Sequence, residues 1–186
     1  GLGVEIFPGF SVSDIKYDET GTAIGVITGD MGISKTNEKK DSFEPGVELL
    51  ASKIIIAEGA RGSLAKKLIH KFELDKFSDK PKFGLGLKEL WEVDEKIHTP
   101  GKVDHFVGWP LDDKTGGGGF MYQLEDNQIS IGFVVHLNYR NPYISPFEEF
   151  QKFKTHPKIS AILKGGKRIS YGARVITEGG LQSIPK

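Results

Sequence analysis

Alternating apolar and polar positions in the first third of the chain predict short β-strands. The two clearest patterns are separated by Asp18-Glu-Thr-Gly21, a set of turn-forming residues that predicts a hairpin. A polar loop is expected over 29–45. A continuous apolar run beyond it is typical of a parallel strand covered on both faces, and an amphipathic helix follows. The predicted elements are strands at 4–7, 11–17, 23–28, 46–51 and 53–57 and a helix at 64–72.

Longer strands follow, and four of them in succession imply an antiparallel sheet. Ser145-Pro-Phe-Glu148 forms a capping box with proline at the first helical position, which predicts a helix that stops before Pro157. A shorter helix is expected through 159–163. The predicted strands are 83–93, 103–109, 119–124 and 128–137, with a return strand at 167–175. The fold class is therefore α+β, an antiparallel sheet with flanking helices.

The composition narrows the range of functions. The 186 residues are 38% hydrophobic and include 24 glycines and 12 phenylalanines, which favours a packed sheet over a helical bundle. Because 25 basic residues balance 25 acidic ones, we expect no nucleic-acid partner. The absence of cysteine excludes thiol catalysis and cysteine-ligated metal centres within this chain. The five histidines are isolated, so we assign no metal ligand, and no residue is assigned a catalytic role.

Four consecutive glycines between aromatic-rich segments are the most distinctive local feature. Glycine lacks the Cβ atom that keeps a partner away, so Gly116 to Gly119 can bring bare N–H groups against a flat ligand. The alternative is a flexible hairpin tip. Trp109 and Phe120 flank the run and could supply apolar walls, or could serve as ordinary sheet core.

A second glycine turn, Glu58-Gly-Ala-Arg-Gly-Ser63, joins the apolar run to the helix. The order strand, glycine turn and helix is the one that dinucleotide-binding folds place beside a cofactor. The alternative is a tight connection in which Gly59 serves only the backbone geometry, because no full Gly-x-Gly-x-x-Gly pattern is present.

Seven ordered motifs together resemble the electron-transfer flavoprotein:ubiquinone oxidoreductase family. The resemblance covers essentially the whole chain but only the middle of the family's enzymes, and the chain begins and ends as a piece of a longer protein would. The FAD fingerprint and the four-cysteine [4Fe–4S] domain of such enzymes are outside it. The motifs lie at 84–91, 101–105, 107–112, 131–135, 141–147, 165–169 and 171–174.

The resemblance implies three segments and two sites. Residues 1–75 would belong to a Rossmann-like FAD-binding domain, 76–172 to a ubiquinone-binding domain, and 173–186 would return to the FAD domain. Gly117 and Gly118 match the two glycines that approach the quinone in this family, with Trp109 and Phe120 as further candidates. The residues near FAD would be Glu58, Gly59 and Arg61.

The resemblance also implies the function of the parent protein. It would be a membrane-associated flavoenzyme, an electron-transferring-flavoprotein dehydrogenase, that passes electrons from reduced electron-transfer flavoprotein through FAD and a [4Fe–4S] cluster to ubiquinone. It would lie on the surface of the inner mitochondrial membrane or of a bacterial cytoplasmic membrane, and this piece alone should be inactive. Two alternatives are a related FAD-dependent prenyl reductase or monooxygenase and a non-catalytic β-rich binding module.

Overall fold

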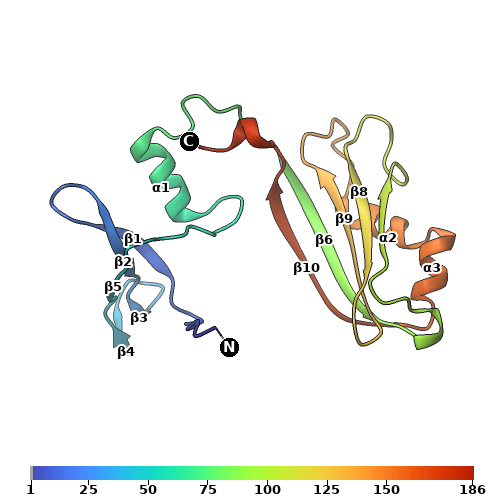
Figure 1. Ribbon diagram of the computed structural model, residues 1–186, viewed down its shortest axis with the longest axis horizontal. Helices are drawn as coiled ribbons and strands as arrows, with labels where there is room; N and C mark the ends of the chain where they lie inside the picture. The colour runs from blue at the N-terminus through green and yellow to red at the C-terminus, as the bar shows by residue number, and fades with distance from the viewer. Residues whose placement is uncertain (1) are drawn as a thin grey trace. The chain divides into compact units, whose positions relative to one another are not determined.

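The computed structural model describes residues 2–186, which divide into two compact units (Figure 1). The first unit ends at Lys76, and the second extends from Phe77 to Lys186. We describe each unit by itself. The boundaries that the family resemblance implies, at 75/76 and 172/173, remain predictions.

The first unit contains the predicted hairpin. Its turn is held by the Asp18 carboxylate, whose Oδ1 accepts hydrogen bonds from the backbone N–H groups of Thr20 and Thr22, both at 2.9 Å. A third strand extends this pair into a sheet of order β1-β2-β5. Its strands are β1 (Val12–Tyr17), β2 (Ala23–Thr28) and β5 (Glu48–Leu50), all antiparallel.

The predicted polar loop at 29–45 is a second hairpin, formed by β3 (Met31–Ile33) and β4 (Lys39–Glu44). The Ser34 hydroxyl accepts hydrogen bonds from the N–H groups of Thr36 and Glu38 and so closes its turn. The prediction of a loop was wrong because β4 is mostly charged, and an exposed two-stranded ribbon needs no apolar alternation.

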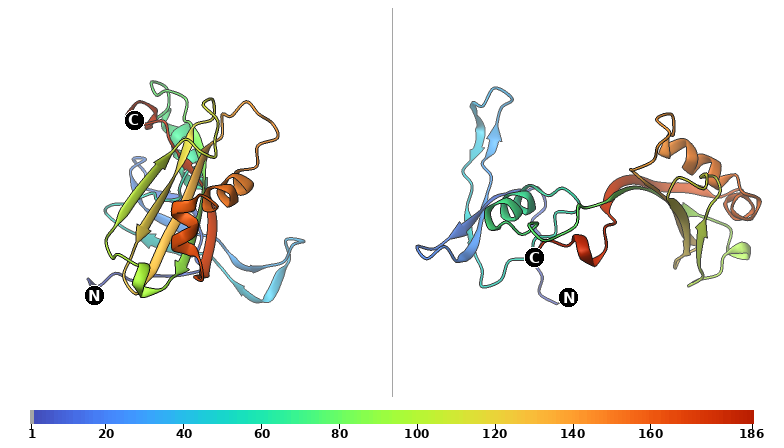
Figure 2. Two further views of the ribbon diagram at one scale, coloured as in Figure 1. Left: turned by 90° about the vertical axis from the view of Figure 1, so that its right-hand side faces the viewer. Right: turned by 90° about the horizontal axis from the view of Figure 1, so that it is seen from above.

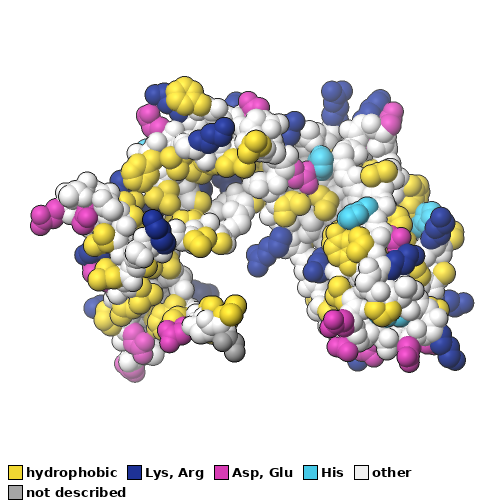
Figure 3. Space-filling view, viewed as in Figure 1, with side chains coloured by type: hydrophobic (Ala, Val, Ile, Leu, Met, Phe, Trp, Pro, Cys, Tyr) yellow, Lys and Arg dark blue, Asp and Glu magenta, His cyan; other side chains and the backbone are white. Residues whose placement is uncertain are grey.

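Two other predicted strands of the first unit are also absent from the described residues. Neither 4–7 nor 53–57 is a strand, and Ile55 is 89% exposed. Figure 3 shows hydrophobic side chains at the surface of this unit. A strand forms only where a neighbour accepts its backbone hydrogen bonds, and no described segment pairs with either run. The amphipathic helix is present as α1 (Ser63–Phe72).

The second unit is built on one antiparallel sheet, as the sequence predicts, and its strand order is β10-β6-β9-β8-β7. The long strands β6 and β9, which are separated in the sequence by β7 and β8, pair along nearly their whole lengths, from Gly84–His136 to Glu92–Gln128. The strands are β6 (Phe83–Glu92), β7 (Val103–Val107), β8 (Gly117–Gln123), β9 (Gln128–His136) and β10 (Lys167–Thr177). β10 continues to pair with β6 beyond residue 172, up to Thr177.

Two helices cover one face of this sheet (Figure 2). The helix α2 (Pro146–Lys154) begins at Ser145, whose hydroxyl accepts from the Glu148 N–H, and Pro146 is its first residue. The helix α3 (Pro157–Leu163) follows directly. Short 3₁₀ turns occur at Glu95–Ile97 and Leu181–Ser183. The buried core lies between helices and sheet and includes Ile131, Phe133, Val135, Phe150, Phe153, Ile159 and Leu163. The α+β class is confirmed.

Candidate functional site

The two faces of the five-stranded sheet differ because successive strand residues point to opposite sides. In β9, Ile131, Phe133 and Val135 are fully buried in the core under α2 and α3. The alternate residues Gly132 and Val134 must therefore point the other way. We call the side under the helices the covered face and the opposite side the open face.

The strand registers align the residues of the open face in rows. Each row crosses from β8 through β9 and β6 to β10, and its members are direct antiparallel partners. One row ends on an arginine, and the next contains a lysine and two glycines. The rows are Gly118–Val134–Gly86–Arg174 and Phe120–Gly132–Lys88–Gly172.

The glycine run is part of the sheet, because Gly117, Gly118 and Gly119 are the first residues of β8. The alternative of a hairpin tip was therefore wrong for these three positions. A Cβ on Gly119 would overlap the Phe153 ring, and a Cβ on Gly117 would overlap the Val134 carbonyl oxygen. Both glycines let the covered face pack closely. Gly118, one residue from each of them, faces the open side.

This placement restricts how the glycines could meet a ligand. Gly118 lies between Val107 of β7 and Val134 of β9, so its backbone groups are directed within the plane of the sheet. A Cβ on Gly118 would overlap the Phe106 carbonyl oxygen. The strand therefore offers a ligand a close approach to its surface, and fewer free N–H donors than an open loop would offer.

The two aromatic candidates lie in different places. The Phe120 ring lies on the open face over Gly132, where a Cβ would collide with it, and its centroid is 4.8 Å from that of Tyr122. Trp109 lies beyond β7, half exposed, with its ring 5.6 Å from that of His156 at the start of α3. Phe106 and Met121 are core residues of the covered face. Only Phe120 lines a cavity of the open face.

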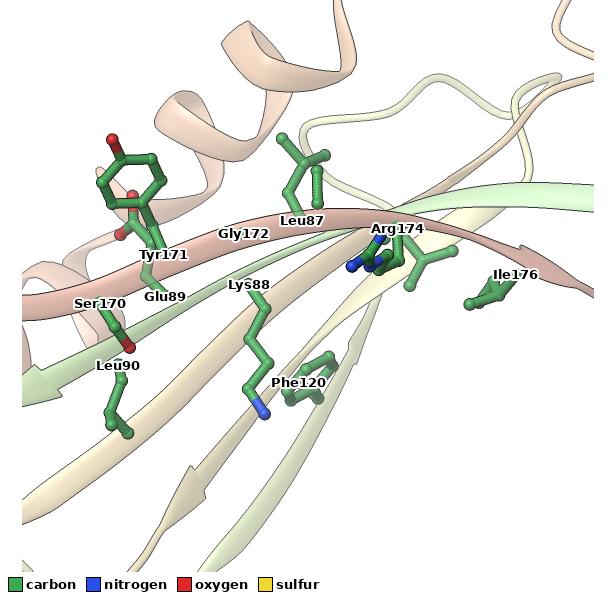
Figure 4. A pocket seen from close by; sticks show the side chains of 13 residues that line it. Leu87, Lys88, Glu89, Leu90, Phe120, Ser170, Tyr171, Gly172, Arg174 and Ile176 are labelled. Atoms are coloured by element: carbon green, nitrogen blue, oxygen red, sulfur yellow. The ribbon is translucent and has the colours of Figure 1, made fainter. Parts of the chain in front are cut away.

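That cavity has a volume of about 450 Å³ and lies over β6, β8, β9 and β10 (Figure 4). Its volume is in the range of small-molecule sites, about 300–1,000 Å³. Apolar walls come from Leu90, Phe120, Val134 and Ile176, and polar groups from Lys88, Ser170 and Arg174. Sequence reasoning did not select Lys88, Gly86 or Gly172. The available sequence signal was their spacing, because Gly86 and Lys88, and likewise Gly172 and Arg174, lie two residues apart on one predicted strand and so point to the same face.

The turn before α1 is arranged around Glu58. Its Oε2 accepts a hydrogen bond from the Ala65 N–H at 2.9 Å, in the first turn of the helix. A Cβ on Gly62 would overlap the Glu58 side chain, and Gly59 has φ +78°, so glycine is required at both positions. Because a carboxylate already occupies this helix end, the turn does not fit a flavin phosphate. Arg61 is exposed.

A buried acid on the covered face was also missed. Glu89 is 3% exposed, and its oxygens accept hydrogen bonds from Lys154 at 2.8 and 2.9 Å, Trp91 Nε1 at 2.8 Å and Arg168 at 3.1 Å. Burial raises the pKa of Glu89, but the hydrogen bonds from Lys154, Trp91 and Arg168 outweigh it and hold the pKa below its ordinary value. The cluster ties α2 and β10 to β6.

Within residues 2–186, no group of three or more histidine, cysteine, aspartate or glutamate side chains could hold a metal ion. No helix in the described part of the chain is both long and apolar enough to cross a membrane.

The second unit is thus an α+β domain, an antiparallel sheet with one helix-covered face and a hollow of small-molecule size in the other. A sequence model of the family described as "ETF-QO, ubiquinone-binding" matches residues 83–176, from the first residue of β6 nearly to the end of β10. The chain belongs to the electron transfer flavoprotein-ubiquinone oxidoreductase family.

Whole-chain relatives agree with this assignment. The rice (Oryza sativa) "Electron transfer flavoprotein-ubiquinone oxidoreductase, mitochondrial" is 53% identical over 99% of this chain and 32% of its own length. The Pseudomonas aeruginosa protein of the same name, without the word mitochondrial, is 48% identical over 100% of the chain and 34% of its own length. The chain thus spans about a third of these relatives. The solved structure of a flavin-dependent brominase aligns with 91% of this chain and 38% of the brominase chain, at 10% sequence identity and a TM-score of 0.49. We draw no conclusion from a similarity of this size. Neither alternative from the sequence is supported by the family matches.

Proposed function

We propose that this chain is the ubiquinone-binding part of a flavoenzyme that passes electrons from reduced electron-transfer flavoprotein to ubiquinone. The observation that carries the proposal is the match of residues 83–176 to a family model described as ubiquinone-binding. Those residues form the sheet, whose open face carries the cavity, and the two helices that cover its other face. The activity is assigned to the full-length parent, an electron-transferring-flavoprotein dehydrogenase.

FAD and a [4Fe–4S] cluster, bound in the parent, would supply the electron-carrying chemistry. The chain has no cysteine, so any cluster ligands are contributed by other parts of the parent. The turn at Glu58, Gly59 and Arg61 is a candidate neighbour of the flavin rather than the holder of its phosphates, because the Glu58 carboxylate occupies the helix end.

The quinone site lies on or beside β8. Gly118 and Phe120 both face the open side of the sheet, and Phe120 lines its cavity. Gly117 faces the helices and lets the strand pack, so its contribution to quinone binding is indirect. Trp109 contacts His156 instead, and it would meet a quinone only outside this cavity.

The parent protein would work at a membrane surface, since ubiquinone is held in the lipid. We infer monotopic attachment to the inner mitochondrial or the bacterial cytoplasmic membrane, since the relatives include a protein named mitochondrial and a bacterial one. Electron-transfer flavoprotein is the inferred protein partner, as the names of the relatives suggest.

The test is electron transfer in the full-length protein carrying Phe120→Ala. We expect flavin reduction by reduced electron-transfer flavoprotein to persist and ubiquinone reduction to fall about tenfold, because one aromatic wall is lost. Phe72→Ala removes an equal ring from the first unit and serves as the control. Bulky residues at Gly117 or Gly118 would collide with backbone carbonyls and are less informative. A wild-type protein unable to reduce ubiquinone would overturn the proposed function.

A further inference from the structure

A histidine and a glutamate meet at the end of the open face where β8 begins. His136 is the last residue of β9, and Glu178 follows the end of β10. The His136 Nε2 lies 2.5 Å from the Glu178 Oε2. This oxygen is buried, and within residues 2–186 the ion pair with His136 is its only polar contact. Because a buried carboxylate oxygen needs a proton-bearing group opposite it, we assign a proton to Nε2 of His136.

Two glycines make room for this pair. The His136 N–H donates to the Gly116 carbonyl oxygen at 2.9 Å, and Gly84 is the partner of His136 in β6. A Cβ on Gly116 would overlap the His136 ring, and a Cβ on Gly84 would overlap the Glu178 carboxylate. Neither glycine has a positive φ, so the backbone conformation does not require them. What requires them is the space for the histidine and the glutamate.

The second ring nitrogen of His136 faces the glycine run. Of the ring atoms, Nδ1 is the nearest to the point that a Cβ of Gly116 would occupy. In the described part of the chain Nδ1 has no hydrogen-bond partner. Gly118, the next open-face residue of β8, is two positions along the strand from Gly116, about 7 Å away. A ligand that approaches the glycines of β8 therefore comes close to Nδ1.

The surroundings let the His136 ring exchange protons while Glu178 stays in place. The His136 side chain is 43% exposed and so reaches water, whereas that of Glu178 is 18% exposed. The Glu178 N–H donates to the Lys82 carbonyl oxygen at 2.7 Å, which fixes the start of its side chain. Arg174, in β10, is the other charged residue near this end, and within residues 2–186 it forms no ion pair.

We propose that His136, oriented by Glu178, donates a proton to the ubiquinone oxygen beside the start of β8 when the quinone is reduced. This inference rests on the proposed function and keeps the quinone at the glycines of β8. Ubiquinone takes two electrons from the reduced flavoenzyme and two protons to become ubiquinol. One proton leaves Nδ1 of the doubly protonated imidazole and forms an O–H bond, while Nε2 keeps its proton opposite Glu178. The other oxygen takes its proton from water, and water then restores the proton on Nδ1.

The first experiment separates proton donation from quinone binding in the full-length protein. We expect His136→Ala to lower kcat for ubiquinone-1 about 100-fold, the lower end of what a positioned general acid contributes. Kd for ubiquinone-1, measured by calorimetry on the oxidised protein, should change much less, because the bound oxidised quinone has taken up no proton. Ferricenium, a one-electron acceptor that takes up no proton, should be reduced at the wild-type rate. His98→Ala, at the other end of β9 beside the Gln128 carbonyl oxygen, is the matched control.

The second experiment tests how the pair works. Between about pH 5 and pH 8 the wild-type kcat should fall as pH rises, because only the doubly protonated imidazole donates, and His136→Ala should lack this fall. Added imidazole should restore kcat in His136→Ala. Glu178 is a positioning residue, so Glu178→Gln should lower kcat about tenfold, leave Kd unchanged and have no further effect in the His136→Ala background. Thermal unfolding should show that the variants fold. His136→Gln, which keeps a polar side chain but exchanges no proton, replaces His136→Ala if that variant unfolds.

The outcomes separate this inference from the function on which it rests. If the wild type reduces ubiquinone and His136→Ala matches its kcat and pH dependence, the proton comes from elsewhere and the inference is wrong. If His136→Ala slows ubiquinone-1 and ferricenium equally, the pair only holds the end of the sheet together and the inference is again wrong. Either result leaves the proposed function standing. A wild type that cannot reduce ubiquinone overturns both.

Discussion

The covered and open faces of the five-stranded sheet are made by the same strands yet have opposite composition. The covered face carries Phe133, Met121 and Ile131, all nearly or fully buried, and one buried acid with three donors. The open face carries glycines, the cations Lys88 and Arg174, which form no ion pair within residues 2–186, and a cavity of about 450 Å³. Period-two alternation thus lets each strand contribute to stability on one side and to ligand binding on the other.

This division implies that substitutions one residue apart should have different consequences. A change on the covered face should alter the free energy of unfolding, and its effect on activity should follow from the loss of folded protein. A change on the open face should leave the fold intact and alter only the binding of a ligand.

The largest effect is expected for Phe153→Ala. The Phe153 ring is 2% exposed and packs against the rings of Phe106 and Phe133, with centroids 5.3 and 5.0 Å away. Its truncation leaves a cavity and should lower the free energy of unfolding, measured in urea, by about 3–5 kcal/mol. Phe147→Ala, on the same helix but 54% exposed, is the control and should cost much less. Equal losses for the two variants would contradict the division between faces.

We expect Glu89→Gln to lower the free energy of unfolding by about 3 kcal/mol, because Lys154 and Arg168 would lose their shared carboxylate. The pKa of Glu89 is lower in the folded protein than its ordinary value of 4.5. Its ionised form therefore contributes stability above that ordinary value, and the contribution is lost as pH falls through the lowered pKa.

The pH dependence gives this prediction a separate test. Unfolding measured between pH 7 and pH 3 should show the wild type converging towards Glu89→Gln in acid. Glu92→Gln, on the same strand but exposed, should follow the wild type throughout. A constant difference between wild type and Glu89→Gln at all pH values would mean that the Glu89 charge does not carry the effect.

Gly119→Leu should lower the free energy of unfolding by about 1–3 kcal/mol, since the new leucine side chain would enter the space of the Phe153 ring and overpack the core. Combined with Phe153→Ala, the same substitution should partly fill the cavity, so the double variant should be more stable than the sum of the two single losses predicts. Strict additivity in urea unfolding would show that the two positions do not share this space.

The smallest effect is expected for Gly172→Val on the open face. A β-branched residue suits a strand, and nothing lies within 4 Å of the added Cβ. The free energy of unfolding, measured by thermal unfolding, should therefore fall by no more than about 0.5 kcal/mol, or rise slightly. A clear loss of stability would show that the open face is packed more tightly than its cavity suggests.

The sequence predicted the second unit better than the first. The five strands and two helices of residues 83–177 are long, periodic and marked by caps such as Ser145, and each was found close to its observed limits. In the first unit the sequence predicts a loop where the charged strand β4 lies, and a strand at 53–57, where no described segment pairs with the chain. Apolar pattern alone does not reveal whether a partner strand exists.

The sequence by itself determined the family, the α+β class, the order of elements in the second unit and the choice of β8 as the strand to examine. Only the tertiary structure decided that Gly117 and Gly118 face opposite sides, that Trp109 and Phe120 are apart, and that Lys88 and Arg174 share a hollow. The physical reason is register. Local pattern fixes which residues alternate, but the pairing of strands distant in sequence fixes which side chains become neighbours.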